Sequence, residues 1–225
     1  MLPLTAHLSG TTGWARQSQN GLKFETICRS CNSHLGIQYD PTVIGFAATV
    51  TRCVNALIAL PRSVQVAVKV QRLMKGVVGH LLAAEVDYRS TFFSEWASNY
   101  VLDPAAKLPK AINIFFWLHD GPESLAVTDL IKYSLRHGSE HVLHALKFPP
   151  LGFLITSDRM YDGLPSLSRH RAAHPDDEVV VRVPLRARRP ADWPEAPSDA
   201  DGTISLFGGG AANAIRATIL TADAA

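Results

Sequence analysis

The stretch 111–118, Ala-Ile-Asn-Ile-Phe-Phe-Trp-Leu, decides the fold class, because the hydrophobic pattern of the chain changes there. Its isoleucines and aromatic residues, followed by His-Asp-Gly-Pro at 119–122, are typical of a short strand that ends in a turn. Segments before this stretch have the spacing of helices, and segments after it have the character of strands. We therefore predict an α+β protein in which helices come first and a largely antiparallel sheet follows.

Upstream of this stretch, two segments have helical patterns. Between residues 63 and 85, apolar side chains recur at spacings of three and four, which predicts one helix with Ser63 as its N-cap. Residues 90–100 are a second predicted helix, which ends at the Asp-Pro pair 103–104. The apolar residues of the first helix are Val66, Val70, Leu73, Val77 and Leu81.

Two further helices are expected near the N-terminus. A short one begins at Asn32 and is expected to stop at Gly36. The next is expected to open with Asp40 as its N-cap and Pro41 at the first helical position, where a missing N–H costs nothing.

Downstream of residue 118, residues 142–148 and 151–155 are predicted strands, and 179–185 is the last clear one. The proline pair 149–150 joins the first two, which favours a sheet edge or a bend over an unbroken central strand. Proline and glycine then become frequent. We divide the chain into a zinc-knuckle segment (1–40), an α+β domain (41–187) and a loosely held tail (188–225).

The bulk composition is that of a globular protein. The chain has 225 residues, 47% of them hydrophobic, and a net charge of +2 from 22 basic and 20 acidic residues. No large single-sign field marks it as a nucleic-acid or membrane binder, so any basic surface must be local. Its apolar stretches are interrupted by charged residues, and we expect no membrane partner. Three cysteines cannot form a disulfide framework, which favours a reducing compartment and a cytoplasmic location.

The most chemically specific feature is a Cys-x-x-Cys motif at Cys28 and Cys31. A tight turn brings two such thiolates to one tetrahedral zinc ion, which needs four ligands. The remaining ligands would come from His7, His34, Cys53, another chain or residues outside this sequence. Two other interpretations stay open: unligated cysteines beside a helix start, and a redox pair, which is disfavoured because no strand leads into the motif.

The wider context of the cysteine pair resembles a known family. Residues 20–36, from Asn-Gly-Leu through Cys-Arg-Ser-Cys-Asn to Leu-Gly, look like the second half of an HNH-type endonuclease module, and Met-Leu-Pro at 1–3 resembles the end of its His-x-x-Pro strand. The resemblance implies that Cys28 and Cys31, with His7 as a further candidate, hold a structural zinc ion. It also implies that Asn20 orients the catalytic histidine.

By the same resemblance, Asn32 and His34 lie near a catalytic divalent ion such as magnesium, and the partner is nucleic acid, DNA rather than RNA. The family's first Cys-x-x-Cys and its general-base histidine would fall before Met1, so phosphodiester hydrolysis requires that this missing half be supplied. As given, the chain is expected to be inactive. The alternative is a non-catalytic binding or scaffold protein, and a homodimer is compatible with both.

Other charged groups have simpler interpretations. His137, His141 and His144 would share one face of a helix and bind a metal, but the alternation of this segment favours a strand, in which they would not. Lys69, Arg72 and Lys75 form a basic stripe that either contacts phosphates or is solvated. His170 and His174 lie in a basic loop with Arg169 and Arg171, and these histidines are expected to be solvated.

Overall fold

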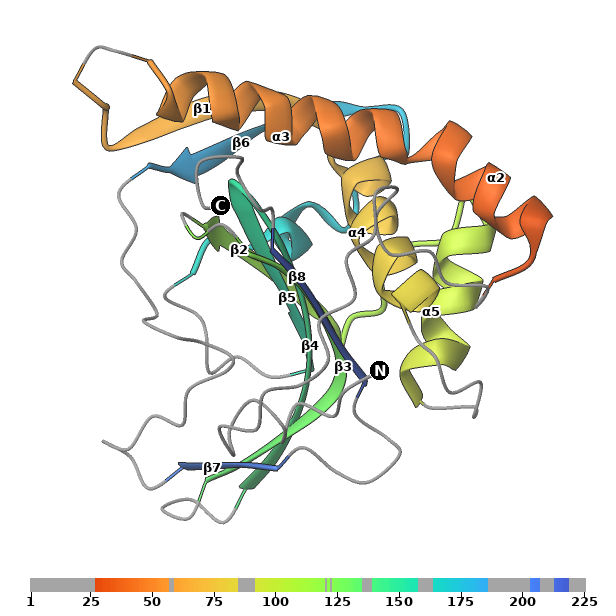
Figure 1. The fold of residues 1–225 in the computed structure, drawn as a ribbon. Helices are drawn as coiled ribbons and strands as arrows, with labels where there is room; N and C mark the ends of the chain where they lie inside the picture. The colour runs from red at the N-terminus through yellow and green to blue at the C-terminus, as the bar shows by residue number, and fades with distance from the viewer. Residues whose placement is uncertain are drawn as a thin grey trace.

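The structure is a computed structural model that describes residues 27–56, 59–84, 92–119, 121, 123–134, 139–157, 164–185, 203–206 and 213–218. Figure 1 shows its helices gathered along one side of an antiparallel sheet. The helices are α2 (Arg29–Gln38), α3 (Asp40–Val54), α4 (Val70–Ala84), α5 (Phe92–Leu102) and the 3-10 helix η1 (Leu167–His170). The strands are β1 (Ser63–Lys69), β2 (Asn113–Leu118), β3 (Glu123–Ser134), β4 (Ser139–Phe148), β5 (Leu151–Thr156), β6 (Glu178–Pro184), β7 (Thr203–Leu206) and β8 (Asn213–Thr218).

The strands form two sheets whose pairings are all antiparallel. The larger sheet has the order β2-β5-β4-β3-β7, and β8 also pairs with β3. The smaller sheet consists of β1 and β6, which lie alongside α3 in Figure 1. The predicted α+β class is confirmed.

The N-terminal helices differ from the prediction at their ends. The helix after the cysteines begins at Arg29 and passes through Gly36 to Gln38. Tyr39, and not Asp40, is the N-cap of α3, whereas a proline does occupy the first turn as expected. The two helices are therefore separated by a single residue.

The predicted helix 63–85 is wrong in its first part, because residues 63–69 form β1 and only 70–84 are helical. Val66 and Val68 are buried while Gln65 and Ala67 are exposed, which is the period-two pattern of a strand. The spacing from Val66 to Val70 suits both a strand and a helix, so by spacing alone the helical pattern of α4 continues into β1. Ser63 is consequently no helix cap.

The larger sheet confirms the strands predicted at 111–118, 142–148 and 151–155. The bend at the proline pair 149–150 is confirmed as the turn between β4 and β5, but neither strand lies at an edge. β3 was not predicted, because its sequence mixes polar and apolar residues without strict alternation. It carries a register shift between Val127 and Leu130.

The C-terminal segment 188–225, expected to be a loosely held tail, supplies β7 and β8 to the larger sheet. β8 pairs with residues 123–128 of β3 and β7 with residues 131–134. Both strands thus cover the side of β3 that faces away from β4 in the strand order. The division of the chain into three domains stays a prediction.

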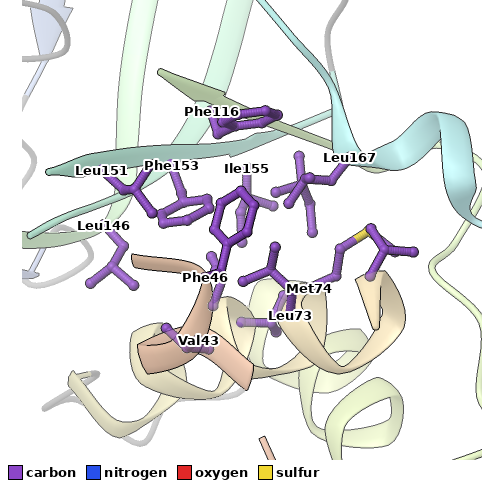
Figure 2. Close-up of a cluster of buried hydrophobic side chains, with 14 of the residues drawn as sticks. Val43, Phe46, Leu73, Met74, Phe116, Leu146, Leu151, Phe153, Ile155 and Leu167 are labelled. Atoms are coloured by element: carbon purple, nitrogen blue, oxygen red, sulfur yellow. The ribbon is translucent and has the colours of Figure 1, made fainter. Parts of the chain in front are cut away.

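The main core lies between the helices and one face of the larger sheet. Figure 2 shows Val43 and Phe46 from α3 and Leu73 and Met74 from α4 pointing toward side chains of the sheet. The sheet side chains labelled there are Phe116, Leu146, Leu151, Phe153 and Ile155. A second buried cluster, which includes Phe115, Leu130, Leu143 and Leu154, comes from alternate positions of the same strands. Among the helices that the structure describes, none is long and apolar enough to cross a bilayer.

Candidate functional site: a thiol pair at the start of a helix

The two cysteines lie together at the N-terminus of α2. Cys28 is the N-cap residue and has extended backbone angles, and its Sγ accepts a hydrogen bond of 3.2 Å from the backbone N–H of Cys31. The two Sγ atoms are 2.6 Å apart, and the Ser30 hydroxyl lies 3.1 Å from the Cys28 Sγ. The tight turn therefore brings both sulfurs to one point, as the motif predicts.

The two thiols differ in acidity. Hydrogen bonds from the Cys31 side chain, the Ser30 hydroxyl and the Cys31 backbone lower the pKa of Cys28 to about 7. The same side-chain hydrogen bond, with some burial, raises the pKa of Cys31. Since a thiolate is both a nucleophile and a metal ligand, Cys28 is the reactive member of the pair at neutral pH.

Only part of the predicted ligand set is brought together. Within the described part of the chain, no group of three or more His, Cys, Asp or Glu side chains is arranged to hold a metal ion. Cys53 is half-buried in α3, where it packs against the main core. His7, predicted as a ligand, lies outside the described residues. Cys28 and Cys31 thus remain the two ligands that can be placed.

The residues predicted to be catalytic are not gathered into one site. Asn20 lies outside the described residues, and Asn32 is exposed on the first turn of α2. His34 is half-buried one turn after Cys31. Its ring lies edge-on to the Tyr39 ring with the ring centroids 5.6 Å apart, and its Nε2 has no hydrogen-bond partner. Spacing on α2 places Cys31 and His34 on one side of the helix.

The predicted basic stripe is neutralised or buried. Asp176 binds the Arg72 guanidinium at 2.6 Å and lies 3.9 Å from the Lys69 ammonium. Lys75 is buried in the core, and its Nζ donates to the backbone carbonyls of Tyr100, Asp103 and Ala106. The stripe therefore offers no row of cations to a phosphate backbone.

A basic hollow lies instead beside β2 and η1. Two adjoining depressions of about 450 and 480 Å³ share Asn113 and Arg171. Lys110 and Arg169 add two positive charges, and among the residues that the structure describes no acidic one lines either depression. The guanidinium of Arg171 donates hydrogen bonds to the backbone carbonyls of Pro109, Lys110 and Ile112. We call this region the basic hollow.

A buried polar cluster that the sequence does not predict lies where β3 changes register. Asp129 has a φ of 54°, and its backbone N–H donates to Nδ1 of His144, 3.1 Å away. His144 stacks on Phe93 with ring centroids 4.0 Å apart, and burial lowers its pKa to about 3. Burial also raises the pKa of Asp129 to about 6, and its Oδ2 and the Thr128 hydroxyl have no hydrogen-bond partner.

Together these features define the class: an α+β protein with an exposed dithiol at a helix start and a separate basic hollow. Comparison with known proteins adds no relative, because no family model, no curated protein and no solved structure matches the chain.

Proposed function

We propose that this chain is a zinc-binding protein of HNH-endonuclease-like ancestry that associates with nucleic acid. The observation that carries the proposal is the placement of Cys28 and Cys31 on one turn at the start of α2, with both sulfurs at a common point. This arrangement suits the half of a zinc site in which two thiolates come from the beginning of a helix.

The thiol pair fits zinc chemically. Thiolates are preferred zinc ligands, and the lowered pKa of Cys28 provides one at neutral pH. In a tetrahedral site with zinc–sulfur bonds of about 2.3 Å the sulfurs lie roughly 3.7 Å apart, so the pair must open from 2.6 Å. Cys28 is exposed and can make this rotation. Two further ligands, His7 among the candidates, would complete the site.

The basic hollow supports the nucleic-acid partner. Phosphate contacts need positive charge and hydrogen-bond donors but no base-specific geometry. Lys110, Arg169 and Arg171 supply the charge, and the exposed side chain of Ser157 supplies a hydroxyl. Cleavage of a phosphodiester is a further step, which would need Asn20, Asn32, His34, a second divalent ion such as magnesium, and the general-base histidine absent from this sequence.

Zinc content tests the first part of the proposal. We expect close to one zinc ion per chain by elemental analysis of the reduced protein, and loss of that zinc in Cys28→Ser and Cys31→Ser. A Cys53→Ser variant is the matched control, because Cys53 lies in α3 away from the pair. Zinc-free wild-type protein, purified without chelator, would contradict the proposal.

Binding to labelled DNA and RNA duplexes, followed by fluorescence anisotropy across a salt series, tests the second part. Lys110→Glu and Arg169→Glu should each weaken binding about tenfold and lower the salt slope by about one. Lys107→Glu makes the same change of charge at an exposed residue outside the hollow and should have a smaller effect. A protein that binds zinc but neither DNA nor RNA would favour the alternative, a scaffold protein with a structural zinc site.

A further inference from the structure

We propose that Cys28 and Cys31 are also a dithiol–disulfide couple, which exchanges with disulfide substrates through Cys28 as the attacking sulfur and Cys31 as the resolving sulfur. This activity goes beyond the proposed zinc site, although it uses the same two side chains. Its substrates are small-molecule or protein disulfides.

The first support is the distance between the sulfurs. At 2.6 Å, the Sγ atoms are closer to the ~2.05 Å of a disulfide bond than to the roughly 3.7 Å separation of two thiolates on one zinc ion. Forming the disulfide requires the sulfurs to approach further by about half an ångström. The turn at the start of α2 thus keeps the two sulfurs in direct contact in the reduced protein.

The second support is the unequal exposure of the two thiols. Cys28 is exposed at the N-cap, whereas Cys31 is half-buried on the first turn of α2. A substrate disulfide can reach the exposed Cys28 Sγ from solvent, and the Sγ of the half-buried Cys31 contacts that sulfur from the helix side. This difference assigns the roles: Cys28 attacks first, and Cys31 attacks the mixed disulfide.

The third support is the backbone around Cys28. The N–H of Cys31 donates to the Cys28 Sγ at 3.2 Å, and the Ser30 hydroxyl lies 3.1 Å from the same atom. These groups fix the sulfur in place at the start of a helix, where unpaired backbone N–H groups favour negative charge.

The exchange balances without a further reagent. The Cys28 thiolate attacks a substrate disulfide R–S–S–R, which forms a Cys28–S–S–R bond and releases one R–S⁻. The Cys31 thiolate then attacks the Cys28 sulfur, forms the Cys28–Cys31 disulfide and releases the second R–S⁻. The protein loses two hydrogens, the substrate gains two electrons, and the protons given up by the two thiols return to the released thiolates.

Oxidation would also control the metal. A disulfide sulfur is no longer a thiolate ligand, so closing the Cys28–Cys31 bond removes two ligands and releases zinc. This last consequence rests on the proposed zinc function, whereas the exchange reaction does not.

The test uses the full chain with oxidised glutathione as the probe, with and without prior removal of zinc, and identifies each cysteine by alkylation and peptide mass analysis. Wild type should form the Cys28–Cys31 disulfide and leave Cys53 free. Cys31→Ser should accumulate one glutathione on Cys28, and Cys28→Ser should react at least about tenfold more slowly. The second step, in which Cys31 resolves the mixed disulfide on Cys28, should be about tenfold slower in the chain unfolded in urea. The reason is that the folded turn holds the two sulfurs together.

Equal reactivity of Cys28→Ser and Cys31→Ser, or closure no faster in the folded than in the unfolded chain, would overturn the inference. Circular dichroism of each variant checks that α2 and the rest of the fold are intact. The two proposals fail separately: disulfide exchange without zinc in the reduced chain would remove only the zinc site, and zinc binding without exchange would remove only the redox activity.

Discussion

Lys75 illustrates how a single buried charge can serve the fold. Its ammonium lies over the Tyr100 ring at 4.1 Å and binds three backbone carbonyls at and beyond the C-terminus of α5. Carbonyls in this part of a helix have no partner within the helix, and a cation there also complements the helix dipole. A basic residue in a predicted amphipathic stripe would ordinarily be assigned to solvent, so the sequence alone does not reveal this role.

We predict that Lys75→Met destabilises the protein by about 3 kcal/mol, because it leaves buried carbonyls without a donor. Urea unfolding followed by fluorescence measures the change. Lys69→Met is the matched control. The Lys69 side chain is more than a third exposed and its ammonium lies 3.9 Å from Asp176, which is a weak ion pair. We therefore expect the free energy of unfolding to fall by less than about 0.5 kcal/mol. Equal effects of the two substitutions would show that the carbonyl contacts are unimportant.

Asp129 and His144 should give stability opposite dependences on pH. The pKa of Asp129 is raised to about 6, so the stability that its protonated form contributes is complete below its ordinary pKa and is lost as pH rises toward 6. The pKa of His144 is lowered to about 3, so the stability that its neutral form contributes is present above its ordinary pKa and is lost as pH falls from about 6.5 toward 3. Between pH 4 and 6 the two effects oppose each other.

Asp129→Asn should therefore stabilise the protein by about 1 kcal/mol at pH 7 and lose this advantage near pH 4. It should also unmask the His144 dependence, so that stability rises steeply from pH 4 to 6. Asn tolerates the left-handed backbone at this residue, whereas Asp129→Ala adds a strain of about 1 kcal/mol. Thermal unfolding at several pH values compares the wild type with both variants. Parallel pH profiles of the wild type and Asp129→Asn would show that Asp129 does not cause the pH dependence assigned to it.

At the scale of elements, α3 and α4 pack closely through a glycine. A methyl group on Gly76 would lie 2.4 Å from Cγ2 of Val43 and 3.3 Å from Cβ of Tyr39. Val43 is buried in the main core and cannot move freely. Gly76 is thus required by the approach of the two helices and not by its own backbone conformation.

We expect Gly76→Ala to destabilise the protein by about 2 kcal/mol through overpacking, in spite of the better helix propensity of alanine. Gly45→Ala in α3 is the control, since a methyl group there meets no atom within 4 Å. This second substitution should stabilise by about 0.5 kcal/mol. Denaturant midpoints of both variants test the pair, and a stabilising effect at Gly76 would refute the close packing.

The strands that could be predicted are those with a strong local pattern of apolar residues. β2 and β5 were predicted because burial leaves their apolar runs with few polar interruptions, and β4 was predicted from its alternation. β1 was mistaken for helix because its valines continue the spacing of α4, and only pairing with the distant β6 distinguishes the two. β3 escaped notice because its register shift breaks the alternation.

The candidate site shows the same limits. The cysteine pair could be predicted, since its two residues are close in sequence and the tight turn is local. The basic hollow could not, because Lys110 and Arg171 come together only through the contact of η1 with β2. Asp129 and His144 are likewise joined by strand pairing across the sheet, and the sequence carries no signal for it.

At the scale of the whole molecule, the C-terminal segment completes the larger sheet. We predict that deletion of residues 188–225 leaves the outer side of β3 unpaired and causes self-association through that edge. Light scattering over a range of protein concentrations measures the molar mass, which rises on self-association. Deletion of residues 219–225 alone, which removes neither β7 nor β8, is the control and should stay at the mass of the wild type. A truncated chain with wild-type mass and stability would show that the two strands are dispensable.

The pairing of β1 with β6 and of β3 with β8 has a consequence for biosynthesis. β1 must wait for its partner until residue 184 has left the ribosome. β3 can pair with β4 early, but its other edge must wait until residue 218. During translation β1 and this edge of β3 are therefore available to other chains, while α2, α3 and α4 can already pack with one another. Contacts between segments so distant in sequence also slow folding after release, since long loops must close before the sheets form. The nascent protein should accordingly depend on chaperones more than its size alone suggests.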